Sequence, residues 1–143
     1  MRAAVIERYG SPEVIAIAEI PRPEPAAGQV LVRVHAAGVG NWDALIREGK
    51  SVISLSPPLT LGSDIAGVVH SVGPGVTGFG PGDEVYGVTN PDFIGGYAEY
   101  ALASASMVAR KPARKPASLN SVRLHRFPSL RSPHGRCCLS TRT

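Results

Sequence analysis

Apolar residues recur at every second position in short runs along the first 111 residues of the chain. In the segment 29–37, QVLVRVHAA, valines at alternate positions are separated by Leu31, Arg33 and His35. This is the period of a strand with one buried face. The segment therefore predicts a β-strand.

The N-terminal segment predicts a β-hairpin. Residues 1–7 are rich in Ala and Val, the sequence YGSP at 9–12 favours a turn, and apolar residues alternate over 14–20. Prolines at 21, 23 and 25 then favour extended backbone. An extended connector is expected between the hairpin and the strand at 29–37.

A short helix is predicted over Ala44–Glu48. Asn41 and Asp43 precede it and are the residue types that cap helix N-termini, and Gly49 follows it as a C-terminal stop. The helix is expected to have about two turns at most.

Glycine dominates the next part of the pattern. Eight glycines between residues 61 and 91 separate short Val-rich runs, a density typical of turns in a small barrel. Gly95-Gly96 and the alternation over 97–102 predict one further strand. Together these segments predict a mostly β fold, a partly open barrel with one or two short helices.

Charge divides the chain near residue 111. Residues 1–111 carry eight Lys and Arg and eleven Asp and Glu, whereas residues 112–143 carry seven basic residues and no acid. The second segment also lacks helical or strand periodicity, so it is expected to be a disordered basic tail. A nucleic-acid-binding function would rest on this tail alone and is the least favoured interpretation.

The expected cellular location is inferred from the cysteines and from the lengths of the apolar runs. Cys137 and Cys138 are adjacent, which fits neither a disulfide framework nor metal-ligand spacing. No apolar run approaches 18 residues, and Met1 is not followed by a signal-peptide pattern. A cytoplasmic protein that does not enter membranes is expected.

Five motifs follow one another along residues 1–111: YGSPEV, AAGVGNWDALIREG, LTLGSDIAGVV, PGDEVYG and GGYAEY. In this order they resemble the N-terminal half of the medium-chain dehydrogenase/reductase superfamily, in its zinc-independent quinone oxidoreductase branch. The resemblance implies a GroES-like domain over residues 1–111. It also implies a Rossmann domain for NADPH, for which residues 112–143 leave no room.

Four residues of these motifs are interpreted as structural. Gly62 and Gly67 bracket a strand where backbone approaches closely, and Gly82 belongs to a tight turn. Asp43 is expected to bind backbone amides or a basic side chain, and is not expected to act as a general acid.

The ligands of a catalytic zinc are missing. Where zinc-dependent relatives carry a Cys and a His, this chain carries Gly40 and Ser63, and residues 1–136 contain no cysteine. His35 and His70 lie in predicted strands and are expected to be structural. No metal site is predicted.

The resemblance implies hydride transfer from NADPH to a quinone or another electron-poor double bond. Five residues are the candidates to line a substrate cleft: Asn41, Trp42, Tyr86, Asn90 and Tyr97. Trp42 would stack on a flat ring and Asn41 would bind a carbonyl. The alternative interpretation, weighed nearly evenly, is structural: Trp42 would fill the core, Asn41 would cap the helix, and the two tyrosines would pack in strands.

Two positions depart from the quinone oxidoreductase pattern. Many members carry Asn where this chain has Gly40, and Tyr where it has Leu45. Asn41 would take over the first role, and nothing nearby replaces the second. The substrate is therefore expected to differ from a simple quinone.

Two hypotheses account for a GroES-like domain with no cofactor domain. The chain is either part of an oxidoreductase that is inactive alone, or a binding module that docks on a partner through its apolar surface and can form homo-oligomers. The sequence Gly-Arg-Cys-Cys at 135–138 matches a one-nucleotide slip in codons for Trp-Gln-Met-Leu. Residues 112–143 are thus expected to be out of frame.

Overall fold

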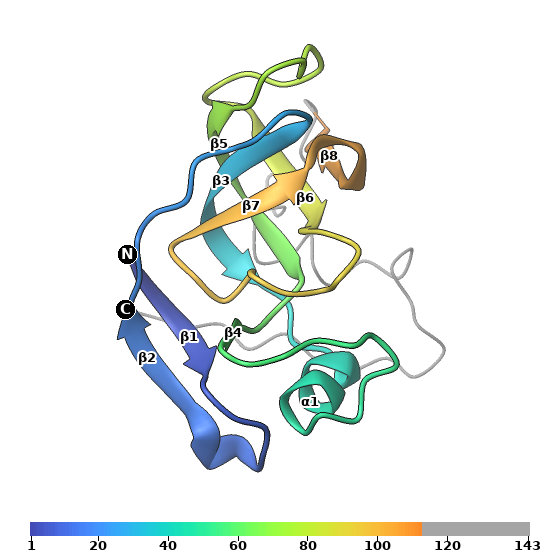
Figure 1. The fold of residues 1–143 in the computed structure, drawn as a ribbon. Helices are drawn as coiled ribbons and strands as arrows, with labels where there is room; N and C mark the ends of the chain where they lie inside the picture. The colour runs from blue at the N-terminus through green and yellow to red at the C-terminus, as the bar shows by residue number, and fades with distance from the viewer. Residues whose placement is uncertain (113–143) are drawn as a thin grey trace.

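The computed structural model describes residues 1–112, where eight strands form two sheets and one α-helix lies beside the smaller sheet (Figure 1). The smaller sheet has the order β2-β1-β4, with bounds Ile15–Glu19, Arg2–Ile6 and Leu59–Thr60. The larger has the order β7-β3-β5-β6-β8, with bounds Tyr100–Ser104, Gln29–Ala37, Asp64–Val72, Glu84–Val88 and Val108–Arg110. The tail, with its predicted disorder and frame shift, lies outside the described residues.

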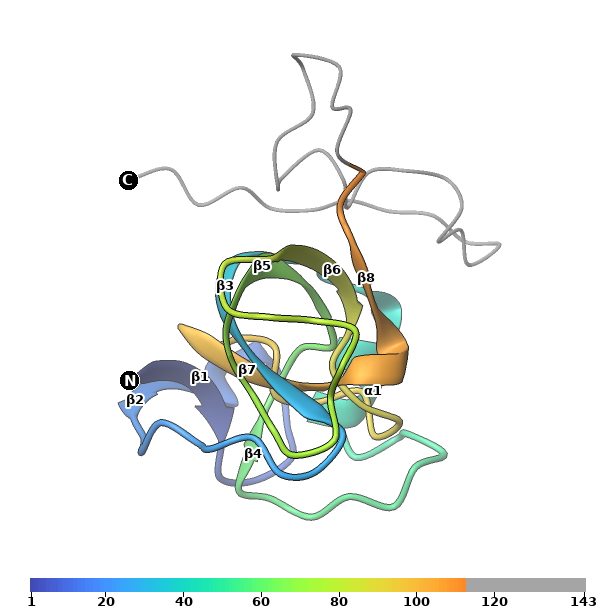
Figure 2. The ribbon, with the colours of Figure 1, turned by 90° about the horizontal axis from the view of Figure 1, so that it is seen from above.

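The larger sheet is a curved, open barrel. Seen from above, its strands surround a common interior (Figure 2). Among residues 1–112, β7 and β8 at its two ends are not paired with each other, so the barrel does not close. A mostly β, partly open barrel is therefore confirmed.

The interior of the barrel explains why its strands alternate. Inward-facing side chains from all five strands form one buried cluster: Val30, Val32, Ile65, Val69, Val85, Ala101, Ala103 and Val108. The strand predicted over residues 29–37 has these bounds in the structure, as β3. It lies between β5 and β7 and contributes two buried valines to the cluster.

The N-terminal hairpin is also confirmed, with one change at the turn. β1 and β2 are antiparallel, from Arg2 opposite Glu19 to Ile6 opposite Ile15. A short 3-10 helix over Pro12–Val14 occupies the start of the second predicted strand. Pro12 sets a helical φ there, so β2 begins one residue later than predicted.

The helix α1 begins earlier than predicted. It spans Asn41–Arg47, with Gly40 at its N-cap. Asp43 is the third helical residue, and its carboxylate accepts a hydrogen bond from the Gly40 amide. Neither Asn41 nor Asp43 is therefore the N-cap residue, although Asp43 binds the capping amide from within the helix.

The last predicted strand, over residues 97–102, begins later because the chain passes from one sheet to the other there. Ala98 bridges to Ala3 of β1, and the Tyr97 carbonyl accepts from the Ala4 amide. The chain then joins β3 as β7, which begins at Tyr100. No helix in the described part of the chain has the length and apolar character needed to cross a membrane.

Candidate functional site

A second apolar cluster packs α1 against the smaller sheet. Its buried members are Ile6, Ile46, Leu59 and Leu61, which come from β1, α1, β4 and the residue after β4. Ile46 faces this cluster from the helix, so α1 has one fixed orientation. The residues 40–43 are thereby placed beside the segment 61–63.

A buried network joins α1 to the segment before β7. Asp43 is only 5% exposed. Its Oδ2 accepts hydrogen bonds from the Gly40 amide at 2.7 Å and from the Tyr97 hydroxyl at 2.9 Å. The same hydroxyl lies 3.1 Å from the Gly38 carbonyl oxygen. Tyr97 thus links the end of β3 to the start of the helix.

Tyr97 has one hydroxyl proton for two acceptors. Asp43 Oδ1 is buried and has no hydrogen-bond partner among the described residues. The Tyr97 hydroxyl donates to Asp43 Oδ2, while the buried Oδ1 receives no hydrogen bond from the described residues, which disfavours the charged form of the carboxyl. Burial raises the pKa of Asp43, opposed by the Gly40 and Tyr97 hydrogen bonds, and burial raises the pKa of Asp64 as well.

Gly62 allows this network to form. Its φ of +87° lies in the left-handed region, and a Cβ there would stand 2.1 Å from Cδ1 of Tyr97. The ring therefore packs directly on the Gly62 backbone. Burial raises the pKa of Tyr97, and the neighbouring Asp43 raises it further, so the phenol keeps its proton.

Trp42 occupies the other side of the helix start. Its indole N–H donates to Ser63 Oγ at 2.9 Å, and Ser63 is 1% exposed. A Cβ at Gly40 would stand 2.5 Å from two ring carbons of the indole. The structure therefore brings Trp42 together with both positions at which zinc-dependent relatives carry a ligand.

The other proposed cleft residues lie differently. Asn41 is exposed at the first position of α1. Asn90 binds its own loop, because its side chain donates to the Ile94 carbonyl and accepts from the Asp92 amide. Tyr86 is partly buried on β6, opposite the buried Ala66 of β5 and the exposed Ala109 of β8.

The remaining motif residues have structural surroundings. A Cβ at Gly67 would lie 2.0 Å from the Arg33 carbonyl oxygen, and Gly82 has a φ of +94° in its turn. His70 packs edge-on against Tyr100 with ring centroids 5.2 Å apart. His35 is exposed on β3, and partial burial lowers its pKa, aided by the positive charge of Arg33.

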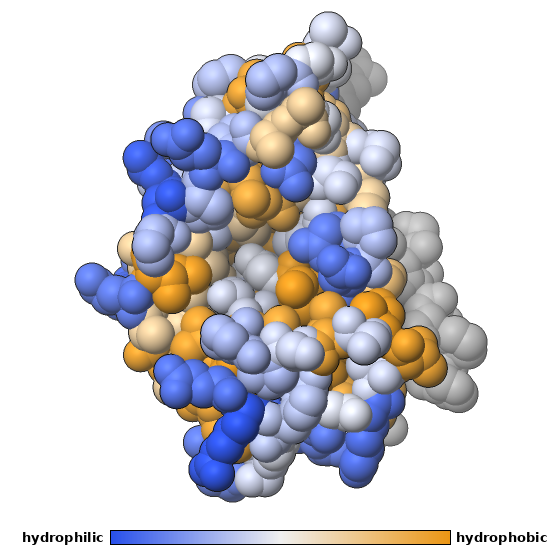
Figure 3. Space-filling model, viewed as in Figure 1, coloured by the Kyte–Doolittle hydropathy of each residue, from blue (hydrophilic) through white to orange (hydrophobic). Residues whose placement is uncertain are grey.

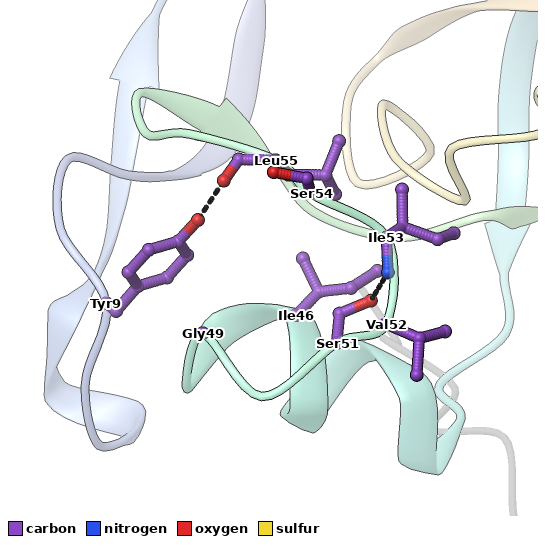
Figure 4. A pocket seen from close by; sticks show the side chains of 8 residues that line it. All are labelled: Tyr9, Ile46, Gly49, Ser51, Val52, Ile53, Ser54 and Leu55. Atoms are coloured by element: carbon purple, nitrogen blue, oxygen red, sulfur yellow. Dashed lines mark hydrogen bonds between the residues drawn. The ribbon is translucent and has the colours of Figure 1, made fainter.

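A cavity that the sequence did not predict lies at the other end of α1 (Figure 4). It has a volume of about 260 Å³ and is lined by Tyr9, Ile46, Gly49, Ser51, Val52, Ile53, Ser54 and Leu55. The Tyr9 hydroxyl donates to the Leu55 carbonyl and closes one side. None of the five proposed cleft residues lines this cavity. Its only signal in the sequence is the mixed Ser and apolar segment 51–55.

Metal-ligand chemistry is absent from the described part of the chain. Residues 1–112 bring together no group of three His, Cys, Asp or Glu side chains. Asp43 and Asp64 are the only acids whose pKa burial raises near the helix start, and no histidine accompanies them. The arrangement therefore holds the partly exposed Trp42 next to a carboxyl network from which burial excludes water.

Comparisons with known proteins agree with this architecture. Residues 26–113 match the alcohol dehydrogenase GroES-like domain. Human quinone oxidoreductase is 42% identical over 113 residues, which cover 78% of this chain and 34% of the human protein. A trans-enoyl reductase of Fusarium mangiferae is 42% identical over 93 residues, which cover 65% of this chain and 23% of that protein.

Solved structures show the same likeness. Escherichia coli quinone oxidoreductase complexed with NADPH superimposes with a TM-score of 0.73 and 30% identity, covering 79% of this chain and 34% of that one. The quinone oxidoreductase from Coxiella burnetii gives a TM-score of 0.73 and 32% identity, with 79% and 37% covered. The chain spans about a third of the length of these relatives. It belongs to the alcohol dehydrogenase GroES-like family, in the quinone oxidoreductase-like branch of the medium-chain dehydrogenase/reductase superfamily.

Proposed function

We propose that this domain is the substrate-side half of an NADPH-dependent oxidoreductase that transfers hydride to a quinone or an activated double bond. The observation that carries the proposal is the start of α1, where the partly exposed Trp42 is held by Ser63 and the next residue, Asp43, belongs to a buried polar network. Similarity to quinone oxidoreductases, one of them complexed with NADPH, supports the same chemistry.

The described residues do not fit the main binding site of a dinucleotide. Such a site needs a parallel βαβ unit with a glycine-rich turn before a helix. Here every strand pairing is antiparallel, and α1 has seven residues. NADPH would therefore be held mainly by residues outside 1–112 or by another polypeptide, and the domain alone is expected to be inactive.

With NADPH held elsewhere, this domain would supply one wall of the substrate cleft. Trp42 would contact the flat face of the acceptor, and Asn41, exposed beside it, would bind a carbonyl oxygen. Asn90 and Tyr97 would act by fixing backbone next to the cleft, since their polar atoms bind neighbouring groups. Tyr86 would contact the substrate from β6.

We propose that the reaction is zinc-independent. Gly40 has no side chain, and the indole of Trp42 stands where a Cβ at that position would point. Ser63 already accepts a hydrogen bond from Trp42. Neither residue type is a usual zinc ligand, and a catalytic zinc normally has three protein ligands.

A second candidate function is a binding module without catalysis. Val39 and Leu45, each 44% exposed, and the fully exposed Val52 lie along the helix start and the following loop. An apolar surface of this kind can dock on a partner or a second copy. A cytoplasmic location and no contact with membrane or nucleic acid are proposed under either function.

A chimera would test the proposed function. Residues 1–111 would replace the matching segment of human quinone oxidoreductase, and NADPH consumption would be followed spectrophotometrically with a naphthoquinone acceptor. The proposal expects quinone-dependent NADPH oxidation, absent from the chain alone and from the truncated human protein. A folded, NADPH-binding chimera with no turnover of quinones or activated double bonds would favour the binding module.

A further inference from the structure

The indole of Trp42 fills the space that a side chain at position 40 would occupy. A Cβ at Gly40 would stand 2.5 Å from Cε2 and Cζ2 and 2.8 Å from Cδ2 of the indole. Cε2 is a ring-fusion carbon and the other two atoms are bonded to it, so an atom this near to all three lies over the face of the ring. The Gly40 backbone therefore packs against one face of the indole.

The edge of the indole is fixed as well. Its N–H donates to Ser63 Oγ at 2.9 Å. Ser63 cannot move easily, since it is 1% exposed and its carbonyl accepts from the Thr89 amide at 2.9 Å. Thr89 is itself fully buried. With one face and one edge held, the orientation of the ring is set before any ligand arrives.

Exposed apolar residues lie close to Trp42 along the chain. Trp42 is partly exposed, and Val39 and Leu45 on either side of it in the chain are each 44% exposed. Figure 3 shows apolar side chains gathered over α1 and the loop that follows it. Asn41 is the exposed polar residue next to the ring. No charged side chain lies among residues 38–42.

We infer that Trp42 is the specificity-determining residue of this site and selects flat aromatic acceptors, because its fixed indole replaces a position-40 side chain. The inference rests on the proposed function and narrows its substrate class to fused-ring quinones and similar planar acceptors. Offset stacking on a fixed ring rewards a planar ligand and gives a small aliphatic acceptor little contact.

The test uses the whole chain and a non-reactive planar probe, anthraquinone-2-sulfonate, with cyclohexanesulfonate as the matched non-planar anion. Trp42 is the only tryptophan, so the ¹H–¹⁵N spectrum contains one indole N–H signal. Titration with the planar probe is expected to shift that signal saturably, and the non-planar anion is expected to leave it unchanged. A shift that is equal for both anions, or absent for both, would overturn the inference.

Two substitutions at position 42 distinguish binding by an aromatic ring from binding by any large apolar side chain. Ligand-detected NMR titration should show Trp42→Phe binding the planar probe within about threefold of the unchanged chain, and Trp42→Leu binding it about tenfold or more weakly. The exposed Ile17→Ala on β2 serves as the control and should bind normally. Equal affinity of the Phe and Leu variants would overturn the inference.

The same variants in the chimera distinguish this inference from the proposed function. Trp42→Leu should raise the KM for a naphthoquinone about tenfold more than it raises the KM for a small aliphatic enone. Unselective loss for both acceptors would refute the specificity role while the oxidoreductase function stands. A chimera that binds the planar probe and never oxidises NADPH would refute the function and leave the binding platform intact.

Discussion

Removing the hydroxyl of Tyr97 should destabilise the fold, since that hydroxyl binds buried groups. In Tyr97→Phe, the Gly38 carbonyl and the 5%-exposed Asp43 lose the donor that lies 3.1 and 2.9 Å from them. The ring would remain packed on Gly62, so the change isolates the hydroxyl.

The size of the effect follows from burial. A buried polar group left without its partner costs about 1–3 kcal/mol. For a domain of this size, each kcal/mol lowers the melting temperature by about 4–8 °C. Urea unfolding followed by circular dichroism would give the free energy of unfolding, and the transition midpoint should fall with an unchanged slope.

Asp43→Asn and the double variant with Tyr97→Phe complete a double-mutant cycle. If the hydroxyl and the carboxyl act together, their effects should be non-additive by about 0.5 kcal/mol or more. A free energy of unfolding unchanged by Tyr97→Phe would refute the reasoning. It would mean that the hydroxyl faces solvent and is available to substrate, as a cleft residue would be.

Two further predictions concern backbone packing and pH. Gly67→Ala places a Cβ 2.0 Å from the Arg33 carbonyl oxygen and should lower the melting temperature strongly, whereas Gly78→Ala, with no atom within 4 Å, should change unfolding by less than about 0.5 kcal/mol. Because burial raises the pKa of Asp43 in the folded state, its contribution to stability is present at low pH and is lost as pH rises through that raised pKa. Unfolding from pH 3 to 8 should therefore show the unchanged chain losing stability relative to Asp43→Asn as pH rises; a constant difference would contradict the raised pKa.

The local pattern of apolar and polar residues was enough to predict the strands that have one buried face. In β3 the valines at 30, 32 and 34 alternate with other residues, and the two neighbouring strands contribute side chains to the same barrel interior. The density of glycines predicted short strands and turns in the same way. These features depend on residues close together in sequence, so periodicity reports them.

Features that depend on distant residues were not predicted. α1 begins at Asn41 because Asp43 binds the Gly40 amide, and Asp43 is held there by Tyr97, 54 residues away. Trp42 and Ser63 are 21 residues apart, and their hydrogen bond depends on the packing of α1 in the second apolar cluster. No local signal distinguished a tryptophan that fills the core from one that presents a ring.

The chain switches sheets at Tyr97 and Ala98 for a reason that alternation cannot show. The sequence YAEY alternates like a single strand, yet its first two residues bond to β1 and its last belongs to β7. The cavity at the far end of α1 likewise needs Tyr9 and Leu55 to meet across the fold. Both depend on tertiary contacts between segments that are far apart in the sequence.

The decisive experiment is calorimetric titration of the whole chain, with NADPH and with a planar quinone added separately. We expect saturable heat with the quinone and none with NADPH, because the domain would form only the substrate side of a two-part site. Stoichiometric micromolar binding of NADPH, or no binding of the quinone, would contradict it.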